Sequence, residues 1–381
     1  MEIINYHTLS DFRVDHKEYL DQLFVQTLGI MSAEGLVTLE RVAHDGTKVK
    51  ACAGADSFRR EERIKTHLKA AEEQLRTLQE SPEEEMSLRR QKARERSTRE
   101  KKERMEHALS ELEKIRKGKT EEEALETRAS INDPDSRIMK QSDDGYAPSY
   151  NLQVSTDSAF GVIVALGVSQ RPEDCHELLP ALERIEENAG KAPVQIVADG
   201  GYTTRENIMA MDEEETDFIG SFEGRSKKKP MHDFHRDKFI YDLESNTYLC
   251  PQGKVLRYRR KDRRVGKENY IYRAKPVDCQ SCPFKQKCCP KTKSRYVART
   301  VDHPAVAAFL EKMKTRKAKE IYKTRGPIAE FSNAWIKSKI GLRAFRLRGL
   351  LKVGMEALWA CLTYNVQQWI RLCWRPGLEQ G

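Results

Sequence analysis

The chain has 381 residues, of which 38% are apolar and 33% charged, and its 68 Lys and Arg against 59 Asp and Glu give a formal charge of +9. This length suffices for one large or two ordinary domains, and the basic balance suits a polyanionic partner, although solubility alone could account for it. No segment approaches the roughly 20 apolar residues of a membrane span, and a secretory leader pattern is absent. The nine cysteines favour a reducing cytoplasm with thiols or a metal over a disulfide scaffold.

The N-terminal part is predicted to form an amphipathic helix followed by the first strand of a sheet. Apolar side chains recur at helical spacing between Tyr19 and Met31, and Glu34-Gly35 interrupts the pattern. The run 36–43 has the composition of a strand and leads directly into Asp45 and a glycine. We therefore expect a carboxylate at the tip of this strand.

A charged helical hairpin is predicted next. Glu, Lys, Arg and Gln dominate residues 58–118, and Ser81-Pro82-Glu83 has the chemistry of a helix start. A short coiled coil is the alternative description of this hairpin. A solvated spacer or a dimer contact is favoured over a catalytic role. The two apolar stripes of this hairpin are Ile64, Leu68, Ala71, Leu75 and Leu78, then Met105, Leu109, Leu112 and Ile115.

The sheet is expected to resume after the hairpin, and an antiparallel run followed by alternating helices and strands is typical of a mixed sheet with helices on its faces. The expected elements are a strand pair over 150–156 and 160–168, helix 175–188, strand 194–198, a helix from about Thr204, and helices 304–339 and 350–369. The expected domains are 1–57 (helix and first catalytic strand), 58–128 (helical-hairpin insertion), 129–224 (α/β core), 225–300 (Cys-rich basic insertion) and 301–381 (C-terminal catalytic helices).

Asp199 is a lone carboxylate directly after the apolar strand 194–198, and two glycines follow it. An ionised Asp is favourable there beside a positive charge, and glycines let a ligand approach the backbone closely. Two interpretations stay open: Asp199 binds a metal ion, or it caps the helix near Thr204. Asp45 repeats the arrangement, and two neighbouring carboxylates are stable only with a bound cation or a shared proton.

Glu330 is the best candidate for a third carboxylate. It shares a helix face with Asn333 and Lys337, at i, i+3 and i+7. Pro327 is expected to open this helix. An apolar stripe should hold the helix against the core, whereas the alternative is an ordinary Glu–Lys surface pattern. The stripe consists of Ile328, Phe331 and Trp335. Three carboxylates that bind Mg²⁺ or Mn²⁺ would make a site for phosphoryl transfer.

The order of these motifs resembles the DDE-type transposases of bacterial insertion sequences, in the group with a Tyr-x-x-Arg…Glu-(x6)-Lys motif. The resemblance extends over nearly the whole chain. It rests on Asp45-Gly-Thr-Lys-Val-Lys-Ala51, Ala198-Asp-Gly-Gly-Tyr202, Tyr322, Arg325, Glu330, Lys337, and the closing run from Leu347-Arg348-Gly349 to Tyr364-Asn365.

The resemblance implies an RNase H-like core in which Asp45, Asp199 and Glu330 hold the metal. It implies metal-dependent phosphodiester cleavage at element ends and transfer of the released 3′-hydroxyl to target DNA. The expected partner is double-stranded DNA, the expected assembly a homodimer, and the expected location the bacterial cytoplasm and nucleoid, without a membrane. Tyr322, Arg325 and Lys337 would contact DNA near the cut end.

Two alternatives remain: a stand-alone nuclease that never joins strands, and an inactive remnant that acts only as a DNA-binding or zinc-dependent interaction protein. The chain departs from the family pattern in two places. Four residues separate Arg325 from Glu330 where the motif has three. Asp45 follows little more than one helix where the family carries a long helical region, so we expect a shortened N-terminal region.

The segment 225–300 combines cysteines with basic residues. Cys279-x2-Cys282 is a good knuckle for tetrahedral Zn²⁺, which Cys250 and Cys288 would complete, with Cys289 adjacent. A structural zinc site and free thiols remain equally open. Basic residues interleaved with Tyr258 predict contacts to phosphates, against the alternative of a solvated loop. The basic residues are Arg257, Arg259, Arg260, Lys261, Arg263 and Arg264.

Other candidates have ordinary explanations. Asp174 is expected to cap a helix, and a catalytic His176 is the minority interpretation. Four turn residues are the rivals of Asp45 as first metal ligand: Asp133, Asp135, Asp143 and Asp144. Three cysteines are expected to serve packing: Cys52, Cys361 and Cys373.

Overall fold

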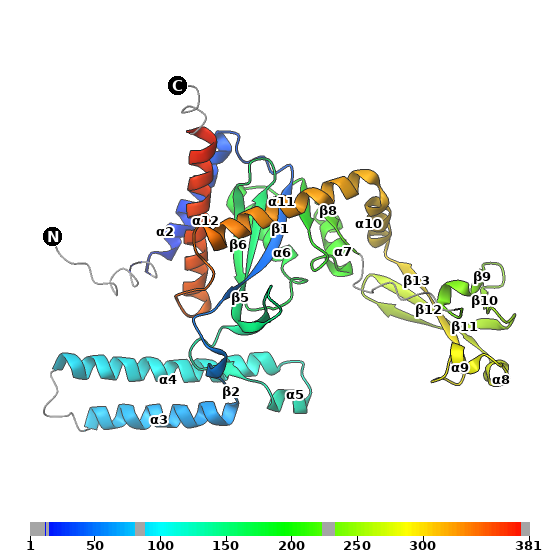
Figure 1. The fold of residues 1–381 in the computed structure, drawn as a ribbon, viewed down its shortest axis with the longest axis horizontal. Coiled ribbons are helices and arrows are strands. Elements are labelled where there is room, and N and C mark those ends of the chain that lie inside the picture. The colour runs from blue at the N-terminus through cyan, green and yellow to red at the C-terminus, as the bar shows by residue number, and fades with distance from the viewer. Residues whose placement is uncertain (1–11, 13–14, 81–87, 223–232, 375–381) are drawn as a thin grey trace. The chain divides into compact units, whose positions relative to one another are not determined.

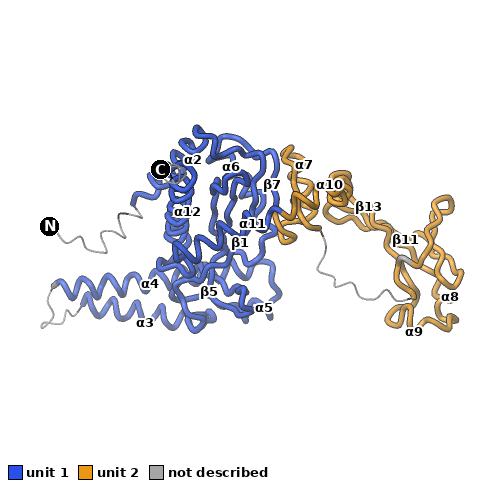
Figure 2. Tube along the Cα trace, turned by 45° about the horizontal axis from the view of Figure 1, so that its top comes forward, with its two compact units in different colours: residues 1–197, 324–381 blue, residues 198–323 orange. Residues whose placement is uncertain are grey.

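The computed structural model describes residues 12, 15–80, 88–222 and 233–374 (Figure 1). Two compact units divide the chain, unit 1 with residues 1–197 and 324–381 and unit 2 with residues 198–323 (Figure 2). Mixed strands and helices make the protein α/β, which is compatible with an RNase H-like fold. The break predicted at Ser81-Pro82-Glu83 lies outside the described residues.

Unit 1 is built on a sheet in which β4, β5, β1 and β7 follow one another, with β6 also paired to β5. The central strand β5 (Tyr146–Asp157) pairs antiparallel with β1 (Val42–Lys50), β4 (Arg137–Lys140) and β6 (Ile163–Ser169). Every residue of β5 from Pro148 onward is buried, so both faces of the sheet are covered. The predicted pairing of 150–156 with 160–168 is confirmed, and β7 (Gln195–Ala198) is the strand before Asp199.

The helices α6 (Leu178–Ala189) and α12 (Leu350–Cys373) pack against this sheet, and α2 (Lys17–Ala33) packs against both of these helices. On α12 the fully buried amide of Asn365 accepts a hydrogen bond from the backbone N–H of Ile163 (2.9 Å) and donates one to its carbonyl (2.8 Å). The side chain thus satisfies the backbone of Ile163, whose donor and acceptor would otherwise be buried without partners.

Two long helices, α3 (Glu61–Glu80) and α4 (Leu88–Arg116), lie side by side (Figure 1). Ile64 on α3 and Met105 and Leu112 on α4 form one buried cluster, so the two predicted stripes face each other. Short elements connect this pair to the sheet: η1 (Ala55–Ser57), β2 (Phe58–Arg59), α5 (Glu121–Leu125) and β3 (Ala129–Ser130).

Unit 2 contains α7 (Arg205–Glu213), β8 (Asp217–Gly220), α10 (Pro304–Lys314) and an antiparallel sheet in the order β13-β12-β11-β10-β9. Phe239, Leu256, Tyr272 and Val297 form the core of this sheet. Its remaining elements are η2 (Arg236–Lys238), β9 (Ile240–Asp242), β10 (Thr247–Leu249), β11 (Val255–Arg264), β12 (Lys267–Ala274), α8 (Pro276–Gln280), α9 (Lys285–Cys288) and β13 (Tyr296–Asp302).

The strand predicted over 36–43 is wrong, because β1 begins only at Val42. Leu39 has a positive φ of 58°. The backbone N–H groups of Thr38 and Leu39 both donate to the carboxylate of Asp157, at 3.0 and 2.8 Å, which fixes a turn. Asp45 therefore lies within a strand and not at a strand tip.

The single helix predicted over 304–339 is also wrong. Thr315 separates two helices, α10 and α11 (Arg316–Ser338). Pro327 lies inside α11 instead of opening a helix. The predicted apolar stripe does not face the core, since the Phe331 side chain is 41% exposed. The buried face of α11 carries Ala329, Ser332, Asn333 and Ile336.

Candidate functional site

Asp45 is the fourth residue of β1, opposite Val154 of β5. Its carboxylate oxygen Oδ2 lies 3.6 Å from Nη1 of Arg325 on α11, and both side chains are less than one-fifth exposed. An ion pair this sheltered from water is screened less than a surface pair. The strand and the helix thus present an acid and a base to each other inside unit 1.

Lys337 approaches the same strand from the last turn of α11. Its ammonium donates a hydrogen bond to the carbonyl oxygen of Lys48, at 3.0 Å. Burial lowers the pKa of Lys337, and attraction to Asp45 opposes part of that decrease. Arg325 and Lys337 therefore set two cationic groups beside the carboxylate of Asp45.

Glu330 and Asn333 lie between these two cations on α11. Glu330 is exposed, whereas Asn333 is only 8% exposed. Within the described residues the amide oxygen Oδ1 of Asn333 has no hydrogen-bond partner. The neighbouring Ser332 fixes the helix by a hydroxyl contact with Thr156 of β5, at 3.1 Å. This face of α11 thus carries one exposed carboxylate and one buried acceptor that lacks a donor.

Asp199 is the first residue after β7, and its Oδ1 accepts a hydrogen bond from the N–H of Gly201, at 2.6 Å. A Cβ at position 200 would lie 3.0 Å from the carbonyl oxygen of Ser221, which explains the glycine. The alternative that Asp199 caps α7 is wrong. The cap is Thr204, whose side chain accepts from the N–H of Asn207.

The remaining residues predicted to bind DNA lie on exposed or partly exposed surfaces. Arg259 and Arg260 are exposed on β11, and Arg260 pairs with Asp262 at 3.2 Å. Tyr322 is half-buried on α11.

The predicted zinc cysteines line one cavity of about 30 Å³ in unit 2. Sulfur Sγ of Cys250 accepts a hydrogen bond from the N–H of Lys254 (3.2 Å), and Sγ of Cys279 accepts one from the N–H of Arg295 (3.4 Å). Burial raises the pKa of the Cys279 thiol, and it raises that of Cys288 to about 11. A fifth thiol, Cys289, also lines the cavity.

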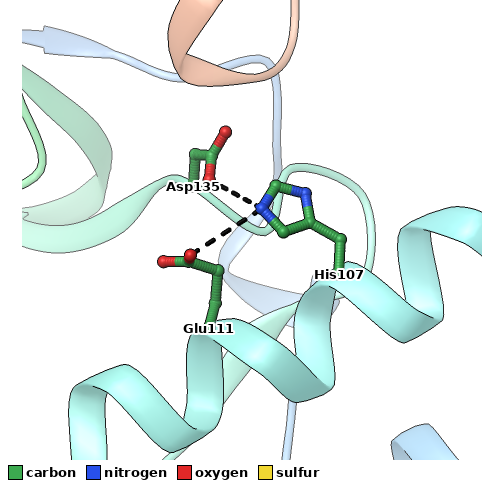
Figure 3. A group of neighbouring side chains, drawn as sticks. All are labelled: His107, Glu111 and Asp135. Atoms are coloured by element: carbon green, nitrogen blue, oxygen red, sulfur yellow. Dashed lines mark ion pairs between the residues drawn. The ribbon is translucent and has the colours of Figure 1, made fainter.

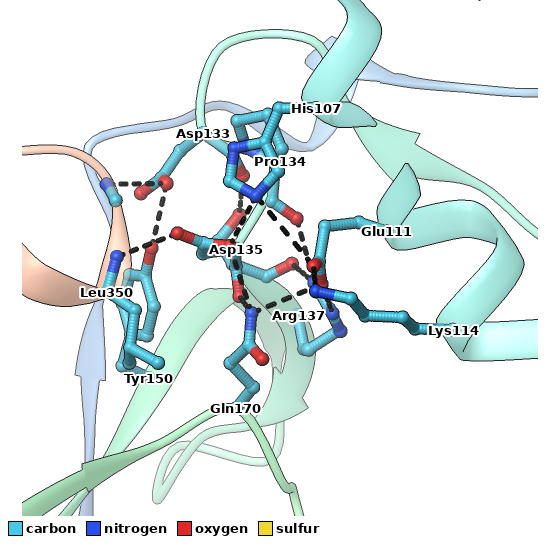
Figure 4. Close-up of polar contacts among 12 residues, drawn as sticks. His107, Glu111, Lys114, Asp133, Pro134, Asp135, Arg137, Tyr150, Gln170 and Leu350 are labelled. Carbon is cyan, nitrogen blue, oxygen red and sulfur yellow. Dashed lines mark hydrogen bonds and ion pairs between the residues drawn. The ribbon is translucent and has the colours of Figure 1, made fainter. Parts of the chain in front are cut away.

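A different acidic cluster joins α4 to the segment before β4 (Figure 3). Nε2 of His107 lies 3.1 Å from Oδ1 of Asp135 and 3.7 Å from Oε1 of Glu111. Glu111 is already engaged, because Lys114 (2.6 Å), Arg137 and Gln170 (3.3 Å) donate to its two oxygens (Figure 4). This cluster is therefore an ion network that joins elements of unit 1, with its carboxylate charge balanced by protein cations.

Asp133 and Asp135 extend this network to the start of α12 (Figure 4). Asp133 accepts hydrogen bonds from the Tyr150 hydroxyl (2.7 Å) and the Gly349 N–H (3.0 Å), and Asp135 accepts from the Leu350 N–H (2.7 Å). Because both side chains bind backbone N–H groups at the start of α12, their role is to stabilise the fold. The other two rivals of Asp45, Asp143 and Asp144, are exposed in the turn that follows β4.

The prediction that Asp174 caps a helix is wrong. Its Oδ1 accepts hydrogen bonds from Lys48 (3.1 Å), Asn151 (2.7 Å) and Gln153 (3.0 Å). Nearby, the fully buried His44 contacts the Ser155 hydroxyl through Nδ1, at 2.9 Å, and burial lowers its pKa to about 4. Sequence reasoning missed this network, although polar residues at every second position of β1 and β5 were a signal for it.

Among the minor candidates, His176 is exposed, and Cys361 is fully buried as expected of a packing residue. Cys52 is half-buried, but Cys373 is exposed, so the expectation of packing is wrong there. Instead, Sγ of Cys373 contacts Oε2 of Glu34 at 3.2 Å.

Comparison with known families identifies the C-terminal part of the chain. A family model described as "Transposase DDE domain" matches residues 249–370. This match supports a DDE-type transposase. DNA is the substrate that this family implies. The match contains Glu330, Arg325 and Lys337, whereas Asp45 and Asp199 precede it. No curated protein and no solved structure matched the transposase.

None of the helices in the described ranges combines the length and apolarity that a membrane crossing needs.

Proposed function

We propose that this transposase cleaves DNA at the ends of an insertion sequence and transfers the released 3′-hydroxyl to target DNA. Asp45, Asp199 and Glu330 would hold Mg²⁺ or Mn²⁺, for which carboxylate oxygens are suitable ligands. When bound, such ions activate a nucleophile and stabilise the leaving oxygen. The observation that carries the proposal is the ion pair of Asp45 with Arg325, whose α11 also carries Glu330 in the matched DDE domain.

The carboxylate of Asp45 has compensating charges in unit 1. It is less than one-fifth exposed and is accompanied by the cationic Arg325 and Lys337, which a metal ion would replace as its partners. Asp199, which directly follows β7, would supply the second carboxylate, as the order of the sequence motifs suggests. The amide oxygen of Asn333 on α11, which lacks a hydrogen-bond partner within the described residues, is a neutral ligand of the kind that binds divalent cations.

The chain's own residues have distinct roles in this proposal. Arg325 balances the charge of Asp45 before DNA arrives, and it then becomes available to a phosphate oxygen as a bidentate donor. Lys337 ties the end of α11 to β1 through the Lys48 carbonyl and so positions Glu330. Tyr322, Arg259 and Arg260 would hold the DNA backbone.

A plasmid that carries the coding frame with its native flanking DNA provides the test. Asp45→Asn, Asp199→Asn and Glu330→Gln should each abolish cleavage in Mg²⁺, whereas Asp143→Asn, a change in an exposed turn, should cleave like the wild type. Asp45→Cys should be inactive with Mg²⁺ and regain activity with Mn²⁺, because a thiolate binds the softer ion better. Full cleavage by Asp45→Asn would refute the assignment.

The same assay separates the alternatives. Cleavage without strand joining would identify a stand-alone nuclease, and DNA binding without cleavage in either metal would identify an inactive remnant. Light scattering on the chain with and without DNA tests the proposed homodimer.

A structural zinc ion is proposed for Cys250, Cys279, Cys282 and Cys288. The support is their shared cavity and the two N–H···S hydrogen bonds, which stabilise thiolates. The raised pKa values of Cys279 and Cys288 describe the metal-free thiols, and a bound cation would remove their protons. The ion would close the loops of α8 and α9 against β10 and leave catalysis to the carboxylates.

A further inference from the structure

Five tyrosines form a continuous group on one face of the β9–β13 sheet, here called the tyrosine face. Ring centroids lie 5.0 Å apart for Tyr241 and Tyr248, 5.0 Å for Tyr248 and Tyr272, 5.9 Å for Tyr272 and Tyr258, and 6.2 Å for Tyr258 and Tyr270. The strand register causes this grouping, because Tyr258 is opposite Tyr272 and Tyr241 is opposite Tyr248.

This face is only partly a core. Tyr272 is fully buried, but Tyr258 is 42% exposed. The hydroxyls of Tyr241 and Tyr272 both donate to Asn246, at 2.9 and 2.6 Å, which fixes these two rings. Asn246 thus fixes two rings of the tyrosine face, and the ring of Tyr258 is accessible to solvent.

Arg299 of β13 places a positive charge within the tyrosine face. Its guanidinium lies 4.9 Å from the ring centre of Tyr241 and 4.8 Å from that of Tyr270, and a hydrogen bond with Tyr272 raises its pKa. In the part of the chain that the structure describes, no carboxylate pairs with Arg299, and its Nε lacks a hydrogen-bond partner. A cation fixed between aromatic rings without a counter-charge is suited to an anionic ligand.

The segment around this face is strongly basic. Residues 233–302 hold 18 Lys and Arg against 8 Asp and Glu, an excess larger than the +9 of the whole chain. Next to the tyrosine face, Lys261 of β11 lies 5.3 Å from the ring centre of Tyr270. Arg257, Arg259 and Arg263 are exposed on the same strand. This charge favours a polyanion over a neutral peptide as the occupant.

We propose that the tyrosine face binds single-stranded DNA, with unpaired bases stacked on Tyr258 and Tyr270 and a phosphate held by Arg299. Stacking needs a base whose flat face is accessible, which a closed duplex does not offer, and aromatic rings beside basic residues are the usual means of binding single strands. This goes beyond cleavage and strand transfer, and it requires neither the three carboxylates nor a divalent cation. Unit 2 would then bind DNA whose two strands have already separated.

The test measures fluorescence anisotropy of a labelled 20-nucleotide oligo-dT strand with the full chain, without added Mg²⁺ or Mn²⁺. Tyr258→Ala should weaken binding about 5- to 100-fold, which is the effect of losing one stacked base, and Tyr258→Phe should restore it. Tyr296→Ala is the matched control, because Tyr296 lies on the opposite face of the same sheet and is 48% exposed. That variant should bind like the wild type.

Two results would overturn the inference. One is that Tyr258→Ala binds oligo-dT as tightly as Tyr296→Ala does. The other is that Tyr258→Ala loses affinity equally for oligo-dT and for a 20-base-pair duplex, which would make the face a surface for duplex phosphates. Because no metal is added, failure here would leave the cleavage test of Asp45 unaffected, and failure of cleavage would leave this binding unaffected.

Discussion

Glu111 offers a quantitative test of how α4 is fixed to the rest of unit 1. Its side chain is 1% exposed and its two oxygens accept from Lys114, Arg137 and Gln170. Glu111→Gln leaves Arg137, whose side chain is 15% exposed, buried without its counter-charge. Removing one partner of a buried ion pair costs about 3–5 kcal/mol, so unit 1 should lose free energy of unfolding in that range.

Lys114→Ala is the matched control for this change. The Lys114 side chain is 62% exposed, so its bond to the same carboxylate is screened by water and should contribute less than about 1 kcal/mol. The double replacement of Glu111 by Leu and Arg137 by Met should recover most of the loss, because no charge is then left buried alone. The recovery would distinguish a charge effect from a packing effect.

Tryptophan fluorescence during urea unfolding measures this loss selectively. All four tryptophans, Trp335, Trp359, Trp369 and Trp374, belong to the unit 1 segment 324–381, so the signal reports that unit. Burial raises the pKa of Glu111, but the hydrogen bonds from Lys114 and Arg137 together with their charges outweigh it, so the net pKa is lowered. The stabilisation is therefore present above the unfolded pKa near 4.5 and is lost as pH falls through the folded pKa. A loss below about 1 kcal/mol for Glu111→Gln at neutral pH would refute the reasoning.

Two further predictions concern titratable groups. Because burial lowers the pKa of His44 from 6.5 to about 4, the unfolded chain binds a proton between these values and the folded chain does not. The free energy of unfolding should fall by up to about 3 kcal/mol as pH drops through that window. His44→Gln should reduce this dependence of the free energy of unfolding on pH, as measured by tryptophan fluorescence. Zinc released by a mercurial and measured with a chromogenic chelator should equal one ion per chain. Cys279→Ser and Cys282→Ser should lose the zinc ion. The controls Cys289→Ser and Cys373→Ser should keep it. Retention by Cys282→Ser with loss by Cys289→Ser would exchange these two ligands.

Local periodicity was sufficient to predict the elements whose partners are close in sequence or whose apolar face is wide. The α3 and α4 stripes are correct because Ile64, Met105 and Leu112 need only each other to form a buried cluster. The strand pair β5 and β6 is correct because a short connection and alternating β-forming residues specify a hairpin. In these places local preference and tertiary packing agree.

The sequence-based predictions fail where residues far apart in the chain determine the local structure. Asp157 fixes the turn at Thr38 from 119 residues away, so the run 36–43 does not become a strand despite its composition. Asp174 accepts from Lys48 across 126 residues, and no local rule for helix caps anticipates that contact. Pro327 lies inside α11, where tertiary contacts of Ser332 and Ile336 outweigh the cost of a proline in a helix interior.

The position of Asp45 within β1 makes a compensating charge necessary. A carboxylate at a strand tip could be solvated by water and would need no partner, whereas Asp45 lies within β1 with less than one-fifth of its side chain exposed. Such a charge must be compensated, and α11 supplies Arg325 at 3.6 Å and Lys337 nearby for that purpose. Arg325 is the residue whose spacing to Glu330 departs from the family motif. Its contact with Asp45 gives it a role that does not depend on that spacing, because it balances the charge of the acid. In the proposed function a metal ion and DNA would replace this contact. Arg325→Met should therefore weaken folding of unit 1 in the absence of metal, while Mg²⁺ should restore part of the lost stability.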